Sequence, residues 1–196
     1  MSNGKYIDTL KQPGFFAFFW TQFLGAFNDN FLKIVVSFVA LDLAVRGGPG
    51  YVEIIAFLFI LPSALVSGYA GHLAHVYSKR TILVAVKFFQ VVVMVLAIAA
   101  FYIGHLESML VLVFLMGLHA AFFSPAKYGI LPEMLPDKDL SRGNGLLEMS
   151  TFMAIILGTS MGSAIFSLWK HNLPLIGLLM LVIAILGVFT SQGIAR

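Results

Sequence analysis

The chain has 196 residues, of which 60% are hydrophobic and 11% are charged, and its formal net charge is +3. The apolar residues form long blocks in place of the periodic scatter of a soluble domain, which excludes a soluble globular fold and indicates an all-α polytopic membrane protein. The chain contains no cysteine, so a disulfide framework and a cysteine-based metal site are also excluded.

Six apolar blocks are long enough to cross a membrane, since a helix needs about 20 residues to span the hydrocarbon core. They lie at residues 14–41, 52–74, 81–103, 107–128, 143–168 and 174–193. The connectors between them are short, which predicts one six-helix bundle. The polar residues 1–12 lead into a span that is too long for a signal peptide, so no cleavable signal is expected.

The first block carries Asp29, Asn30 and Lys33 near its middle. An ionised carboxylate or a lysine at the middle of a bilayer costs about 3 kcal/mol, so such residues persist mainly where they serve a function. Asp29 and Lys33 are one helical turn apart and are predicted to neutralise each other in part. The same helix face carries Gln22, Ala26 and Ser37. This polar face requires water, substrate or a partner helix, and is the first candidate substrate site.

Glycine and proline mark two connectors. The run Gly47-Gly48-Pro49-Gly50 is predicted to form the external turn after the first block. The longest polar connector, residues 129–142, contains Pro132 and Pro136, which are predicted to stop the preceding helix. A solvated hairpin between the fourth and fifth blocks is therefore expected.

Lys127 lies at the end of the fourth block and has two interpretations. A lysine at this depth is usually a topology anchor that reaches the lipid headgroups. The alternative is contact with an anionic phosphate. Lys87 is a similar but weaker candidate, because Gln90 is its only polar neighbour in sequence.

Glu148 lies about one turn into the fifth block. It is either a second charge that lines a cavity or an interfacial residue that pairs with Arg142 or Lys138. Farther along this block, Gly158 and Gly162 form a G-x-x-x-G motif, which favours close packing of two helices.

Three histidines are candidate functional residues. His119 falls in the middle of the fourth block and is predicted to be a neutral, hydrogen-bonded packing residue, with a proton carrier as the alternative. His72 and His75 are three residues apart, but no third ligand follows at a suitable spacing, so no metal site is expected.

Basic residues are distributed unevenly between the two sides of the predicted bundle. One side has only Arg46 and Lys170, and the other has nine, namely Lys5, Lys11, Lys79, Arg80, Lys87, Lys127, Lys138, Arg142 and Arg196. The positive-inside rule then predicts that both termini are cytoplasmic. The net charge reflects this topology, and no nucleic-acid partner is expected. The end at Arg196, directly after a span, predicts an interrupted chain whose polar faces need a second copy or a missing half.

Residues 71–80, GHLAHVYSKR, resemble the G-x-L-A-D-R-x-G-R-R signature of the major facilitator superfamily. The matching residues are Gly71, Leu73, Ala74, Lys79 and Arg80. The segment departs at His75 and Val76, where the family has Asp-Arg, and at Ser78, where it has glycine. By resemblance, the matching residues form a conformational motif between the second and third spans.

Three further segments resemble the bacterial lysophospholipid transporter branch of that superfamily: residues 22–30 (QFLGAFNDN), 123–132 (FSPAKYGILP) and 140–148 (LSRGNGLLE). The resemblance implies the N-terminal six-helix half of a twelve-span fold. It also implies a flippase that moves lysophosphatidylethanolamine and related lipids to the inner leaflet of the bacterial inner membrane for reacylation. Family members stand alone or are fused to an acyltransferase and an acyl-carrier-protein synthetase, which makes these domains, membrane lipids and the C-terminal half the expected partners.

On that resemblance, Asp29 and Lys127 lie on the substrate path, and Glu148 matches the family motif. Asp29 could meet an ammonium, and Lys33 or Lys127 a phosphate. Two alternatives stay open: a proton-coupled exporter of amphiphilic drugs, with Asp29 as proton carrier and His119 as relay, and a membrane anchor that recruits acyl-transfer enzymes. No nucleophile, base and orienting group converge, so neither an enzyme nor a cofactor is expected.

Overall fold

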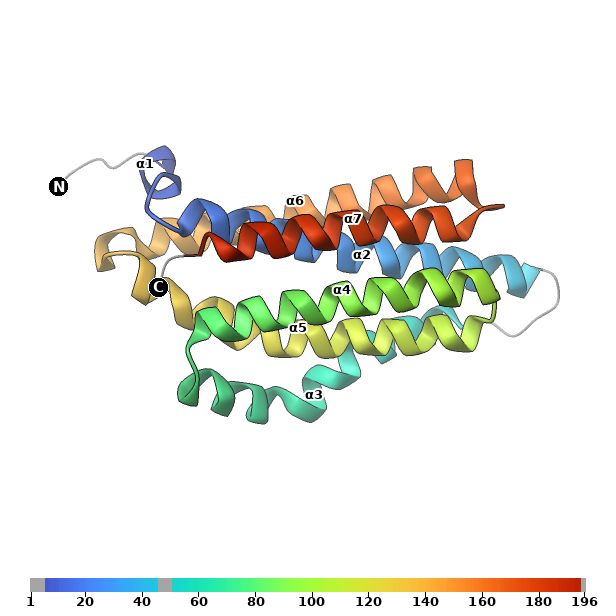
Figure 1. Ribbon diagram of the computed structural model, residues 1–196, viewed down its shortest axis with the longest axis horizontal. Helices are drawn as coiled ribbons and strands as arrows, with labels where there is room; N and C mark the ends of the chain where they lie inside the picture. The colour runs from blue at the N-terminus through green and yellow to red at the C-terminus, as the bar shows by residue number, and fades with distance from the viewer. Residues whose placement is uncertain (1–5, 46–50, 195–196) are drawn as a thin grey trace.

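The computed structural model describes residues 6–45 and 51–194, and this part of the chain is helical, with six helices long and apolar enough to cross a membrane. The helices are α1 (Tyr6–Leu10), α2 (Phe15–Val45), α3 (Val52–Val76), α4 (Lys79–Ile103), α5 (Leu106–Met134), α6 (Asp137–Trp169) and α7 (Leu173–Gln192). Figure 1 shows the six long helices side by side. The predicted all-α polytopic fold is confirmed. The predictions for Lys5, Arg46, the turn at 47–50 and Arg196 fall outside the described residues.

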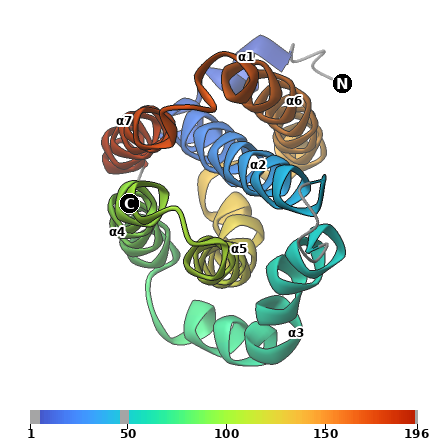
Figure 2. The same ribbon diagram turned by 90° about the vertical axis from the view of Figure 1, so that its right-hand side faces the viewer.

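Helix α2 occupies the middle of the bundle, with α6, α7 and α5 around it (Figure 2). Its most extensive contacts are with α6 and α7, while α3 packs chiefly on α5 and therefore lies at the edge. The larger hydrophobic core includes Phe31, Val35, Met94, Met116 and Met180, contributed by α2, α4, α5 and α7. This arrangement buries Gln22, Asn28 and Asp29 of α2 inside the bundle.

The connector between α5 and α6 differs from the prediction. Helix α5 continues through Pro125 and Pro132 to Met134, and α6 begins at Asp137, so the expected polar hairpin over 129–142 is wrong. A proline removes one backbone hydrogen bond and strains the turn before it. Burial of Ile130, Leu131 and Leu135 against Phe15 and Phe18 of α2 offsets this cost.

The small residues of α6 let it approach α2 closely, which confirms the predicted role of the G-x-x-x-G motif. A Cβ atom on Gly158 would lie 2.5 Å from the backbone oxygen of Phe27. A Cβ atom on Gly162 would meet the side chain of Ile34. Both glycines therefore hold α6 against the helix that carries Asp29.

Gly158→Ala is expected to lower the free energy of unfolding by about 1–3 kcal/mol, because the added methyl group meets backbone that cannot move aside. Gly145→Ala is the matched control on the same helix, because nothing lies within 4 Å of its Cβ position. The control should keep or slightly raise stability, since alanine favours a helix by up to about 1 kcal/mol over glycine. Thermal melting of the two purified variants tests this, and equal melting temperatures would contradict it.

Candidate substrate site

A cavity of about 150 Å³ lies inside the bundle between α2, α4 and α5. It is lined by Gln22, Gly25, Ala26, Asp29, Lys87, His119, Ala120, Phe123, Ser124 and Lys127. Three of the predicted site residues, Gln22, Asp29 and Lys127, are therefore brought together. Lys87 and His119 join them, although the primary interpretation of each from the sequence is different.

Lys87 is a central residue of this cavity. The sequence predicts a surface lysine that helps to set the orientation of the bundle, but the side chain is 0% exposed, so this prediction is wrong. Its Nζ donates to Oε1 of Gln90 at 2.9 Å, and Nε2 of Gln90 donates to Oδ1 of Asp29 at 3.4 Å. Position 87 is eight residues into α4, or about 12 Å along the helix. This distance from the start of the helix is the feature of the sequence that could have indicated a buried lysine.

Gly25 makes room for this lysine. A Cβ atom at position 25 would meet Nζ of Lys87, so α2 presents bare backbone where the ammonium lies. On its other side the ammonium is 5.1 Å from the centre of the Phe123 ring, within the range of a cation–π contact. The buried charge is therefore held by an amide, an aromatic face and a carboxylate beyond the amide.

Asp29 and His119 form the deep end of the cavity, and they are 8% and 3% exposed. His119 Nδ1 lies 3.7 Å from Oδ1 of Asp29, which is too long for a hydrogen bond. Within the described residues, neither ring nitrogen of His119 has a hydrogen-bond partner. The predicted hydrogen bonding of this histidine is therefore not seen, although its ring does stack on that of Phe123, with centroids 6.0 Å apart.

Lys127 forms the other end of the cavity. It is 6% exposed, so its interpretation as a headgroup anchor is wrong. Its Nζ lies 3.4 Å from Oε1 of Glu148 and 3.3 Å from Oγ1 of Thr151. Gln22 donates to the same threonine at 2.8 Å, and the Tyr128 hydroxyl donates to Glu148 at 2.9 Å. The network joins α2, α5 and α6.

The partner of Glu148 differs from the expected interfacial pairs. Arg142 instead donates to Asp139 at 2.7 Å. Glu148 is paired with Lys127 at the cavity's end but does not line the cavity itself. Its predicted role in substrate binding stays a prediction.

Asn30 and Lys33 lie outside the cavity lining. Asn30 donates to the backbone oxygen of Ala26 in its own helix at 2.7 Å. The Lys33 ammonium lies 4.0 Å from the centre of the Phe59 ring on α3. The described ion pairs of Asp29 do not include Lys33, so the predicted polar face of α2 is divided between the cavity and α3.

The residues that match the family signature lie where α3 ends and α4 begins. Lys79 forms an ion pair with Glu133 of α5 at 2.7 Å, and Arg80 donates to the backbone oxygens of Ile194 and Gln192 at 2.8 and 3.1 Å. Ala74 is buried, and Gly71 and Leu73 are half-buried. Lys79 thus connects α4 to α5, and Arg80 connects α4 to the end of α7. The conformational role of the motif stays a prediction.

In the part of the chain that the structure describes, no group of three metal-ligating side chains is close enough to hold an ion. His72 and His75 are exposed at the end of α3. The lining of the cavity contains ammonium, carboxylate, imidazole and amide groups.

A six-helix membrane bundle with charged groups around an internal cavity defines a polytopic membrane protein with an interior polar site. Residues 18–192 match the Major Facilitator Superfamily. The chain belongs to this superfamily.

The chain is also similar to curated bacterial proteins. It is 34% identical over 161 residues to the lysophospholipid transporter LplT of Cronobacter sakazakii, an alignment that covers 79% of this chain and 37% of that protein. It is 29% identical over 163 residues to LplT of Photorhabdus laumondii, covering 83% and 39%. For LplT of Klebsiella pneumoniae the identity is 33% over 168 residues, covering 82% and 38%. The chain thus spans about two-fifths of the length of these relatives.

Proposed function

We propose that this chain is the cavity-bearing half of a lysophospholipid transporter, which moves lysophosphatidylethanolamine and related lipids across the bacterial inner membrane for reacylation. The relatives named as lysophospholipid transporters support this. The observation that carries it is the cavity between α2, α4 and α5, in which charged and polar side chains lie among apolar helices.

The charges of the lining suit a phosphate. Lys87 and Lys127 bring two ammonium groups, and Asp29 is the one acidic residue among the lining residues. A phosphate accepts strong, charge-assisted hydrogen bonds from such donors. The cavity is small, so it receives the polar part of a lysolipid while the acyl chain lies along apolar helix surface. Lys127 and Lys87 are the proposed phosphate contacts.

A second six-helix bundle is proposed to complete the transport path. The relatives are longer than this chain, which supports the proposal. Transporters of this type commonly bind substrate between two bundles that rock about a central site. An acyltransferase and an acyl-carrier-protein synthetase, fused or separate, are the proposed consumers of the delivered lysolipid.

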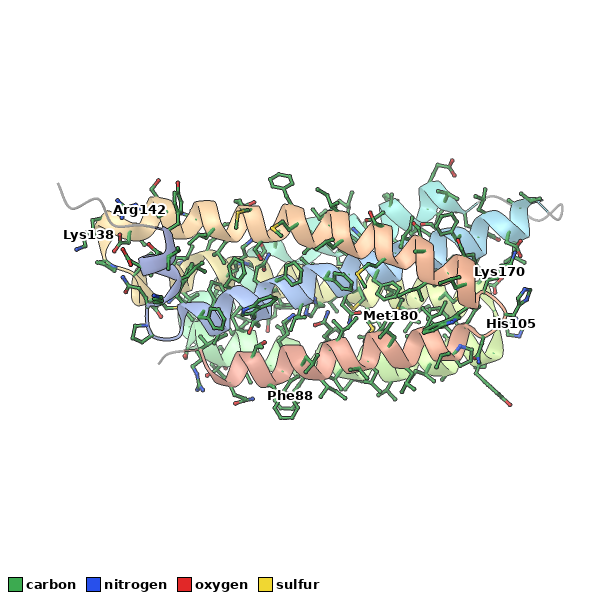
Figure 3. The ribbon with its side chains drawn as sticks, turned by 90° about the horizontal axis from the view of Figure 1, so that it is seen from above. Phe88, His105, Lys138, Arg142, Lys170 and Met180 are labelled. Atoms are coloured by element: carbon green, nitrogen blue, oxygen red, sulfur yellow. The ribbon has the colours of Figure 1, made fainter. Side chains whose placement is uncertain are left out.

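The proposed orientation has both termini in the cytoplasm. Figure 3 shows Lys138 and Arg142 at one end of the bundle and Lys170 at the other. Lys11, Lys79 and Arg80 belong to the first end by their places before α2 and at the start of α4. Basic residues are enriched on the cytoplasmic side of membrane proteins, which supports this orientation even without the buried Lys87 and Lys127.

Reconstitution of the intact transporter tests the function. Fluorescent lysophosphatidylethanolamine is added outside sealed vesicles, and the fraction protected from extraction by albumin is followed over time. Vesicles with the transporter should protect the lipid faster than protein-free vesicles of the same composition. Equal rates would contradict lysophospholipid transport.

Lys127→Gln should lower the initial rate about tenfold or more in this assay, because it removes a charge-assisted hydrogen bond to phosphate. Lys127→Arg keeps the charge with a different geometry and should retain more activity. Lys138→Gln removes an exposed lysine from the same end of the bundle and is the matched control. Wild-type rates in both Lys127 variants would limit Lys127 to a structural role.

A further inference from the structure

His119 is a buried polar side chain that the phosphate contacts leave unused. It lines the cavity, its exposed fraction is 3%, and both of its ring nitrogens lack hydrogen-bond partners within the described residues. An unsatisfied buried polar group is unfavourable, so a ligand that satisfies it gains free energy on binding. The position of the ring beside Asp29 narrows the choice of ligand group.

An uncharged imidazole has one donor nitrogen and one acceptor nitrogen, while a carboxylate only accepts. A hydroxyl both donates one hydrogen bond and accepts others. With Nδ1 of His119 and Oδ1 of Asp29 3.7 Å apart, a single hydroxyl placed against both could accept from the ring and donate to the carboxylate. An ammonium has no acceptor, so it could not receive a hydrogen bond from the donor nitrogen of His119 while it donates to Asp29.

The electrostatic surroundings also disfavour an ammonium at this end. Asp29 is linked through Gln90 to the Lys87 ammonium, so its negative charge already faces a buried cation. A second cation would be repelled by Lys87 at close range. A neutral hydroxyl meets no such repulsion, and it needs little of the 150 Å³ of cavity volume.

We propose that His119 and Asp29 bind the free glycerol hydroxyl of a lysophospholipid. This inference rests on the proposed function. It names the residues by which the transporter distinguishes a lysophospholipid from the diacyl phospholipids of the membrane. A diacyl phospholipid carries an ester at that glycerol carbon, and an ester oxygen can accept a hydrogen bond but cannot donate one to Asp29. His119 is thus a specificity-determining residue.

Equilibrium binding to the intact, purified transporter tests the proposal with two ligands. One is 1-acyl lysophosphatidylethanolamine, and the other is its 2-deoxy analogue, which has hydrogen in place of the hydroxyl. The wild type should bind the lysolipid at least about tenfold more tightly, because a site built to bind a hydroxyl discriminates against its loss. In His119→Phe, which keeps an aromatic ring against Phe123, the two affinities should approach each other.

His105→Phe is the matched control, because His105 is an exposed histidine at the far end of the bundle, and it should keep the wild-type ratio (Figure 3). His119→Leu is a second variant in case the phenylalanine variant does not fold, and it should also lose the discrimination. Equal binding of both ligands by the wild type, or an unchanged ratio in a folded His119 variant, would overturn the inference and leave the proposed function standing. No binding of either ligand by the wild type would overturn both.

Discussion

Lys87→Met is expected to abolish transport and to lower the free energy of unfolding by about 3–5 kcal/mol, the usual cost of leaving a buried charge without its partner. Methionine fills similar space, but it removes the ammonium that donates to Gln90 and balances Asp29. Folded protein can be measured by size-exclusion chromatography of the detergent extract and by thermal melting.

The double variant Lys87→Met with Asp29→Asn separates charge from packing. It removes both members of the buried pair, so most of the lost stability should return while transport stays absent. The coupling between the two positions is then read from the double-mutant cycle. A single Lys87→Met variant with wild-type melting temperature and uptake would show that the two charges do not depend on each other.

Asp29→Asn is expected to lower lysophosphatidylethanolamine uptake about tenfold or more, since an amide accepts a weaker hydrogen bond than a carboxylate does. Asparagine has nearly the same volume, and removing a charge from the middle of a membrane span favours insertion. The Lys87 ammonium then loses its balancing carboxylate, so some folding stability should also be lost. Inserted protein should still form, and its uptake should fall. The measurement is uptake by spheroplasts that express the intact transporter, normalised to the amount of inserted protein.

Asp137→Asn is the control for this experiment, because Asp137 is exposed in the first turn of α6, away from the cavity. Wild-type uptake by Asp29→Asn would reduce Asp29 to a structural partner of Lys87. A defect in insertion would make it a folding residue. A loss confined to proton-driven drug efflux would favour the exporter interpretation.

The helical fold was predictable because hydropathy acts locally along the chain. Six spans follow from length and apolar content alone. The boundary between α5 and α6 was not predictable, because the rule that proline stops a helix considers only local sequence and omits contacts with distant segments. What carries α5 past Pro132 is the packing of Leu131 and Leu135 on Phe15 and Phe18, more than 110 residues earlier in the chain.

The candidate site was predictable only in part, for a related reason. Asp29 and Gln22 share one helix face, so their spacing indicated a common site. Lys87 and His119 each stood alone on an apolar helix, and their meaning depends on helices that fold beside them. Gln90 reaches Asp29 across a separation of 61 residues, which no periodicity reveals.

The contact between Gly25 and Lys87 makes the bundle sensitive to any side chain at position 25. At Gly158 an added methyl group would strike immovable backbone, whereas at Gly25 it would strike the end of a flexible lysine. The lysine can swing away, but only by leaving Gln90 and carrying its charge to another place in the cavity. Gly25→Ala adds only one methyl group, but it would move the buried positive charge of Lys87. The substitution would thus change the electrostatic potential inside the protein although no ionisable residue is altered.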